Sequence, residues 1–118
     1  ASTEENHGDE RKGIPKESRI EAAGITHRIK SAAQGGPMAY PKLVEALSDN
    51  QKLWTALAVD VADGDNGLPS DLRARIFYLA EFVQQHTGKV LAKKARITPL
   101  LEINAAILRG LGDRRLKE

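Results

Sequence analysis

Carboxylate and amide side chains gather in one short stretch of this sequence, DVADGDNGLP, at residues 60–69. Such oxygen ligands bind calcium in helix–loop–helix sites, which need them at loop positions one, three, five and twelve, with glycine at six. Counting from Asp63 puts Asp65 at position three but glycine, leucine and alanine at five, six and twelve, and counting from Asp60 also fails. We therefore interpret the stretch as a turn between helices, since aspartate, asparagine and glycine accept the backbone angles of a helix exit.

The histidines and serines do not form a catalytic pattern either. His7, His27 and His86 lack the spacing of a helical zinc motif, and no serine lies in a nucleophile elbow. His86 falls on an apolar helical stripe, where a lone histidine is more often a hydrogen-bonded structural residue than a ligand or base. We expect a protein with no enzymatic activity, no cofactor and no metal.

Three larger polar or aromatic residues interrupt the apolar stripes, and each has two interpretations. Asn50 and Asn104 either fix the register of packed helices, which we favour, or bond the backbone of a bound ligand chain. Trp54, the only tryptophan, is either the centre of the core, which we favour, or an exposed anchor for a partner helix.

The elements that would position these residues are helical. A first helix is predicted over about residues 16–33, ended by QGGP, and Gly24 in its middle makes it dependent on packing. Its inward face is expected to carry Ile25, Ile29 and Ala32 or Ala33, with Ile20, Ala23 and His27 beside them.

Two longer segments repeat the helical spacing and carry the main predicted core. The first follows Pro41 and the second is opened by Pro69, and the short loop between them predicts an antiparallel hairpin of residues 43–61 and 70–90. The inward positions are Leu43, Leu47, Asn50, Trp54, Leu57 and Val61, then Leu72, Ile76, Leu79, Val83, His86 and Val90.

A fourth helix is predicted with Thr98 as N-cap, Pro99 at its first position and Gly110 or Gly112 at its end. Its inward residues are expected to be Leu100, Leu101, Ile103, Asn104, Ile107, Leu108 and Leu111. The fold class is thus all-α, a small bundle of about four helices. Residues 1–13 are polar without apolar periodicity and are expected to be a disordered leader, followed by a single helical domain over 14–118.

Composition limits the class of protein further. The chain of 118 residues suits one domain and has no cysteine, which excludes disulfides and thiol catalysis. No apolar run is long enough to span a bilayer, and the polar start does not resemble a signal peptide, so we expect a cytoplasmic protein without membrane insertion.

Charge is distributed unevenly along the chain. Residues 1–71 hold 8 basic and 12 acidic side chains, a net −4, whereas residues 72–118 hold 10 and 4, a net +6. The basic candidates for nucleic-acid contact are Lys89, Lys93, Lys94, Arg96, Arg109, Arg114, Arg115 and Lys117. No aromatic residues interleave with them to stack bases, so a solvated face is favoured over RNA binding.

Taken together and in order, the blocks NQKLW, DGDNGLP, LRARI, QQHTG and PLLEINAAILRGL resemble the flagellar biosynthesis regulator FlaF family. Phe82 and Gln85 depart from the family pattern, which often has tryptophan and arginine there. The matched residues are Asn50, Leu53, Trp54, Leu68, Pro69, Leu72, Arg73, Val83, His86, Thr87, Leu101, Glu102, Asn104, Ile107, Gly110 and Leu111.

The resemblance implies a non-enzymatic cytoplasmic protein that acts beside the regulator FlbT and binds flagellin as a chaperone, promoting its synthesis and secretion. A helical module with a groove can cover the amphipathic terminal helices of unassembled flagellin. We expect this groove between the second, third and fourth helices. The residues that line or support it are expected to be Trp54, Ile76, Val83, Ile107 and Leu108, with Arg73 and Lys89 as its charged rim.

Two alternatives stay open. The first is a post-transcriptional regulator that contacts flagellin mRNA through the basic C-terminal half, including Arg114 and Arg115. The second is a calcium-responsive switch at the loop after residue 60, which we do not favour.

Overall fold

The computed structural model describes residues 14–63 and 67–109, which form four α-helices and no strand. The helices are α2 (Lys16–Ala33), α3 (Ala39–Ala62), α4 (Ser70–Leu91) and α5 (Thr98–Leu108). The predicted all-α bundle is therefore confirmed. The predicted leader over 1–13, and the predicted roles of Asp65, Asn66, Gly110 and Leu111, lie outside the described residues.

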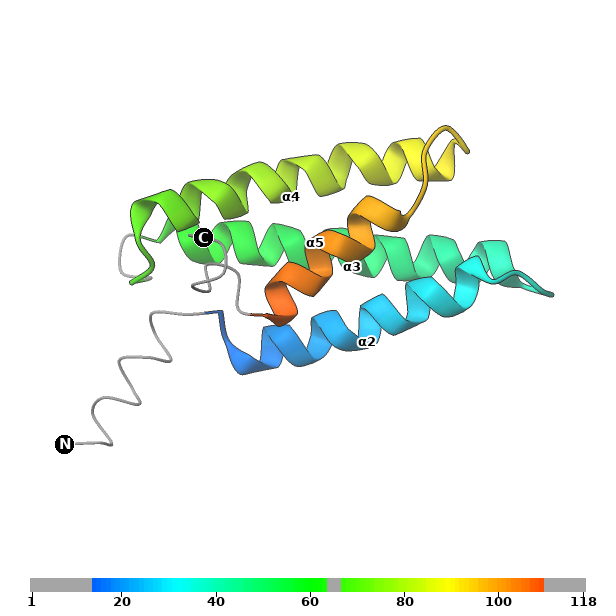
Figure 1. Cartoon of the computed structure of the whole chain (residues 1–118), viewed down its shortest axis with the longest axis horizontal. Helices are drawn as coiled ribbons and strands as arrows, with labels where there is room; N and C mark the ends of the chain where they lie inside the picture. Colours follow the sequence, from blue (N-terminus) through cyan, green and yellow to red (C-terminus); the bar gives the residue numbers. More distant parts are fainter. Residues whose placement is uncertain (1–13, 64–66, 110–118) are drawn as a thin grey trace.

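The helices α2, α3 and α4 lie side by side, with α3 in the middle, and the shorter α5 crosses them diagonally (Figure 1). Helix α3 packs against both α2 and α4, while α5 packs mainly against α2 and touches α4 more lightly. The chain reverses direction from α3 to α4, so the predicted antiparallel hairpin is confirmed. One side of this layer is covered by α5, and the other side has no helix over it among the described residues.

The starts of α3 and α4 are set by prolines and by residues with a positive φ in the preceding loops. Helix α3 begins at Ala39, earlier than predicted, because Met38 turns the chain at a φ of 64° and Pro41 is tolerated in a first helical turn. Helix α4 follows Gly67, at a φ of 93°, and Pro69 at the N-cap position. In each case the residue directly before the helix ends the preceding loop: Met38 before α3 and Pro69 before α4.

Thr98 does not cap α5, so that prediction is wrong. Ile97 occupies the N-cap position in a helical conformation, and Thr98 is already the first helical residue. The carbonyl of Ile97 accepts bonds from the amides of Leu100 at 2.9 Å and Leu101 at 3.1 Å. The turn is therefore closed by the backbone and needs no hydroxyl cap.

The core is aliphatic around a single indole, as the stripes predicted. Fully buried side chains include Ile29, Leu47, Trp54, Ile76 and Leu100, and they come from every described helix. Leu43, Leu72, Leu79, Leu101 and Ile103 are partly buried, as is His86. The predicted stripes of α3 and α4 thus face the interior, with their ends nearer the surface.

Four residues predicted on or beside the inward faces are exposed, so those predictions are wrong. Ile20 is 62% exposed because α2 buries Ala22, Ile25 and Ile29, which place Ile20 on the opposite side of the helix. Leu108 is 40% exposed because it follows the buried Ile107 and lies about 100° further around the short helix α5. Ala23 and His27 are exposed as well.

Candidate partner-binding surface

A buried polar cluster lies where α2, α3 and α5 meet. Trp54 Nε1 donates a hydrogen bond to Asn104 Oδ1 at 2.9 Å. Asn104 Nδ2 in turn donates to Asn50 Oδ1 at 2.8 Å and to Thr26 Oγ1 at 3.1 Å. We call these four residues the amide cluster. It fixes how α5 lies on the other helices, because a slip of one residue along any of them would leave buried polar groups unpaired.

The amide cluster supports the structural interpretation of its asparagines and its tryptophan. Trp54, Asn50 and Asn104 are all fully buried, with 0% of each residue exposed. An indole enclosed in this way does not lie on a surface where a partner helix would contact it. The alternative of Trp54 as an exposed anchor is therefore wrong, and its place is in the core.

Most residues predicted for the groove lie in that same core. Ile76, Val83 and Ile107 are at most 1% exposed and belong to one cluster with Trp54. These four do not line an open surface, and only the predicted supporting role fits their positions. Leu108 lies at the surface on α5.

The two rim charges are separated along α4. Arg73 is half-buried in the first turns of the helix and Lys89 is exposed in its last turn. At a rise of 1.5 Å per residue, about 24 Å of helix lies between them. They do not form one local rim, and Arg73 adjoins a hollow in the surface.

An open apolar surface lies instead along the seam between α3 and α4. Two hollows there, of about 440 Å³ and 340 Å³, both have Phe77 in their lining. Phe77 is 45% exposed and Tyr78 67% exposed. We call this surface the α3–α4 groove; its lining includes Thr55, Ala58, Ala62, Ala74, Phe77, Tyr78, Glu81 and Gln84.

One end of the α3–α4 groove is closed by hydrogen bonds. Gln84 Nε2 donates to the carbonyl of Gln51 and to Thr55 Oγ1, both at 3.2 Å. The opposite end is bordered by Ala62 of α3 and Ser70 of α4. Small side chains thus form the floor between the two helices, and the aromatic residues of α4 form one wall.

The apolar stripes of the sequence do not indicate the residues of this groove. Phe77 and Tyr78 follow the buried Ile76, and their side chains therefore point away from the core stripe of α4. The sequence does contain one signal: Phe77 and Tyr78 are aromatic but occupy no predicted core position. Large exposed aromatic side chains mark interaction sites more often than isolated aliphatic ones do.

His86 has a structural environment, as predicted for a lone histidine on a stripe. Its Nε2 lies 2.7 Å from the carbonyl oxygen of Arg96, so this nitrogen is the donor, since a carbonyl only accepts. The ring stacks on Phe82 with a centroid distance of 5.0 Å. The histidine thereby holds the segment after α4 against the helix.

Basic side chains gather at the end of the bundle where α3 begins and α4 ends. Lys93 Nζ lies 5.9 Å from the centre of the Tyr40 ring, and the Tyr40 hydroxyl donates to the carbonyl of Leu91 at 3.4 Å. Tyr40 is 51% exposed. Lys89, Lys94 and Arg96 are exposed nearby along the chain, whereas Arg114, Arg115 and Lys117 lie outside the described residues.

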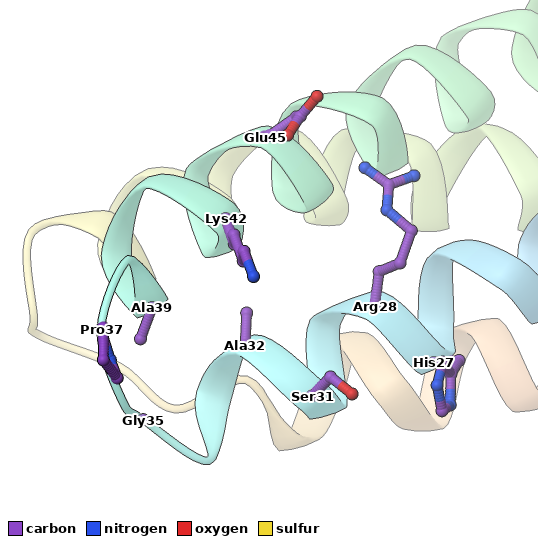
Figure 2. Close-up of a pocket in the computed structure, with 9 residues that line it drawn as sticks. All are labelled: His27, Arg28, Ser31, Ala32, Gly35, Pro37, Ala39, Lys42 and Glu45. Carbon is purple, nitrogen blue, oxygen red and sulfur yellow. The ribbon is translucent and has the colours of Figure 1, made fainter.

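A third hollow, of about 330 Å³, lies between α2 and the start of α3 (Figure 2). Arg28 on its wall is bonded through Nη2 to Asp49 Oδ2 at 2.7 Å. The lining also includes Ser31, Lys42 and Glu45. Polar side chains therefore surround this pocket, in contrast to the apolar α3–α4 groove.

The loop after α3 is described only in part. Asp63 ends the helix in an extended conformation and Gly67 has a positive φ, both consistent with the predicted turn. Within residues 14–63 and 67–109, no group of three histidine, aspartate or glutamate side chains is arranged to hold a metal ion. In the same part of the chain, no helix is long and apolar enough to cross a membrane.

Comparison with known proteins identifies a family. The model of the family described as flagellar protein FlaF matches residues 14–111, which include all four described helices. The resemblance seen in the sequence blocks is thereby confirmed. Neither a curated protein nor a solved structure matches the chain.

Proposed function

Since the chain belongs to the FlaF family of flagellar proteins and therefore has a role in flagellum biogenesis, we propose that it binds flagellin as a cytoplasmic chaperone and promotes flagellin synthesis and secretion. It acts by binding and not by catalysis, without a cofactor, and in functional partnership with FlbT. The segment that it binds is a terminal amphipathic helix of flagellin, whose apolar face needs cover before assembly.

The observation that carries this proposal is the α3–α4 groove. Phe77 and Tyr78 stand exposed beside the small side chains of Ala58, Ala62 and Ala74, so a continuous apolar strip follows the helix seam. A guest helix recognised in a groove places residues at intervals of three and four against such a strip.

The predicted site residues retain a part in this proposal. Trp54 of α3 packs in one core cluster with Ile76 and Val83 of α4, and these contacts hold the two helices at a fixed separation. Arg73 borders the groove near Phe77 and can pair with an acidic residue of the guest helix. Ile107 supports the core, and Leu108 and Lys89 lie away from the groove on α5 and the end of α4.

The test is a titration of the protein with flagellin and with peptides of its two terminal helices, followed by calorimetry. The variant Phe77→Ala/Tyr78→Ala removes the aromatic wall and is expected to weaken binding at least about tenfold, because buried aromatic anchors dominate interface energies. Its matched control is Ile20→Ala, an exposed apolar residue on α2, which should leave affinity within about twofold.

Unchanged affinity in the double variant would refute the groove as the site. Absence of binding by the folded protein at micromolar concentration would refute flagellin binding itself. The far-ultraviolet circular dichroism of every variant serves as the control for folding.

A second candidate function, contact with flagellin mRNA, is favoured by one observation. The exposed Tyr40 ring beside Lys93 brings an aromatic side chain to the basic end of the bundle, where it can stack a base. This hypothesis predicts an affinity for the transcript leader that falls steeply with salt and with Lys93→Gln/Lys94→Gln. Binding that is insensitive to both would refute it.

A further inference from the structure

The pocket between α2 and α3 is separate from the α3–α4 groove and is built from different side chains. At about 330 Å³ it is within the range of roughly 300–1,000 Å³ that small-molecule sites occupy. Its lining combines the alanines Ala32 and Ala39 with the polar residues Arg28, Ser31 and Lys42. A small apolar floor under a few convergent polar groups is typical of a ligand site.

Lys42 is the key charged residue of this pocket. Figure 2 shows its ammonium group between α2 and α3, directed toward Ala32 and not out along α3. Among the described residues, no carboxylate forms an ion pair with it. The ammonium group thus has three donors available to a ligand.

Arg28 supplies a second cation from the opposite wall, which α2 forms. Its bond to Asp49 uses Nη2, so the guanidinium group is held in place while its other nitrogens keep their donors. The pairing with Asp49 offsets much of the arginine charge, and Lys42 therefore provides the net attraction. Glu45, also in the lining, lies on α3 one turn beyond Lys42 and restricts which side of the pocket an anion can enter.

We propose that this pocket binds a small organic anion through its carboxylate or phosphate group. Lys42 holds the anionic group, Arg28 and the hydroxyl of Ser31 donate further hydrogen bonds, and the body of the ligand lies over Ala32 and Ala39. The binding is non-covalent and independent of the α3–α4 groove.

The experiment is a titration of isotope-labelled full-length protein, followed by the amide signals of Ser31, Gly35 and Lys42. The probes are benzoate, its neutral analogue benzyl alcohol, and inorganic phosphate. We expect saturable shifts with benzoate or phosphate and none with benzyl alcohol. Lys42→Gln should weaken this binding about tenfold, since hydrogen bonds to charged groups contribute that much.

The matched control is Lys93→Gln, which removes the same charge from the basic end but from outside the pocket lining. It should change the affinity by less than about threefold, because exposed charges are screened by solvent. Equal weakening in both variants would show a diffuse cationic surface and overturn the proposal. So would shifts that fail to saturate, or equal binding of benzyl alcohol.

Discussion

The two sides of α3 have opposite chemistry. On the side that faces α5, amide groups are buried in the amide cluster, although burial favours apolar side chains. On the side of the α3–α4 groove, the aromatic side chains of Phe77 and Tyr78 are exposed, although exposure favours polar side chains. The buried amides specify one arrangement of the helices, whereas the exposed aromatic residues leave an apolar surface for a partner.

The largest expected effect comes from breaking the amide cluster. Asn104→Ala removes the partner of both the Trp54 indole and the Asn50 carbonyl, so two buried polar groups lose their hydrogen bonds. We expect the free energy of unfolding to fall by about 3 kcal/mol, measured by urea denaturation. Glu102→Ala, an exposed change on the same helix, should cost less than about 0.5 kcal/mol. A loss below about 1 kcal/mol for Asn104→Ala would contradict the assigned role.

Substitutions in the α3–α4 groove, unlike Asn104→Ala, should change the free energy of unfolding only slightly. Phe77→Ala/Tyr78→Ala is expected to lower the free energy of unfolding by no more than about 1 kcal/mol, because Tyr78 is mostly exposed and Phe77 is about half exposed. Urea denaturation without any partner measures this. A loss as large as that of Asn104→Ala would mean that Phe77 and Tyr78 stabilise the fold and are not primarily a binding surface for a partner helix.

A third substitution tests a buried polar group outside the amide cluster. Thr87 is fully buried, and its Oγ1 has no hydrogen-bond partner among the described residues. Thr87→Val keeps the shape and removes this hydroxyl, so the protein should become more stable by up to about 1 kcal/mol. Thermal unfolding provides the measurement, with Thr98→Val as an exposed comparison. Marked destabilisation by Thr87→Val would show that the hydroxyl is bonded in solution.

The smallest effect is expected at the ion pair on the outer side of α2 and α3. The side chains of Arg28 and Asp49 are 45% and 37% exposed, so solvent screens their attraction. A double-mutant cycle of Arg28→Gln and Asp49→Asn should give a coupling free energy below about 0.5 kcal/mol. A coupling above about 1.5 kcal/mol would indicate that the pair fixes α2 on α3.

Helix existence and the main packing stripe could be predicted from the sequence because both depend on local periodicity. The spacing of Leu47, Trp54 and Leu57 fixes one face of α3 whatever lies beside it. The bounds of α2 also agreed, since QGGP ends any helix that precedes it.

Features that depend on the neighbour of a helix could not be predicted in this way. Leu108 is predicted to face inward because its side chain is apolar. However, α5 is short and buries only the side that holds Leu100, Asn104 and Ile107. The pairing of Trp54 with Asn104 joins residues 50 positions apart, which no local pattern indicates. The α3–α4 groove likewise requires knowing which side of the hairpin α5 covers.

The α3–α4 groove is proposed to receive an amphipathic helix of a partner. The most direct measurement is a nuclear magnetic resonance titration of the labelled protein with peptides of the flagellin terminal helices. We expect saturable shifts concentrated at residues 55–62 and 74–84, with the Trp54 indole signal hardly moved. Shifts concentrated on α5 or at the basic end near Tyr40, with the groove unchanged, would contradict the proposal.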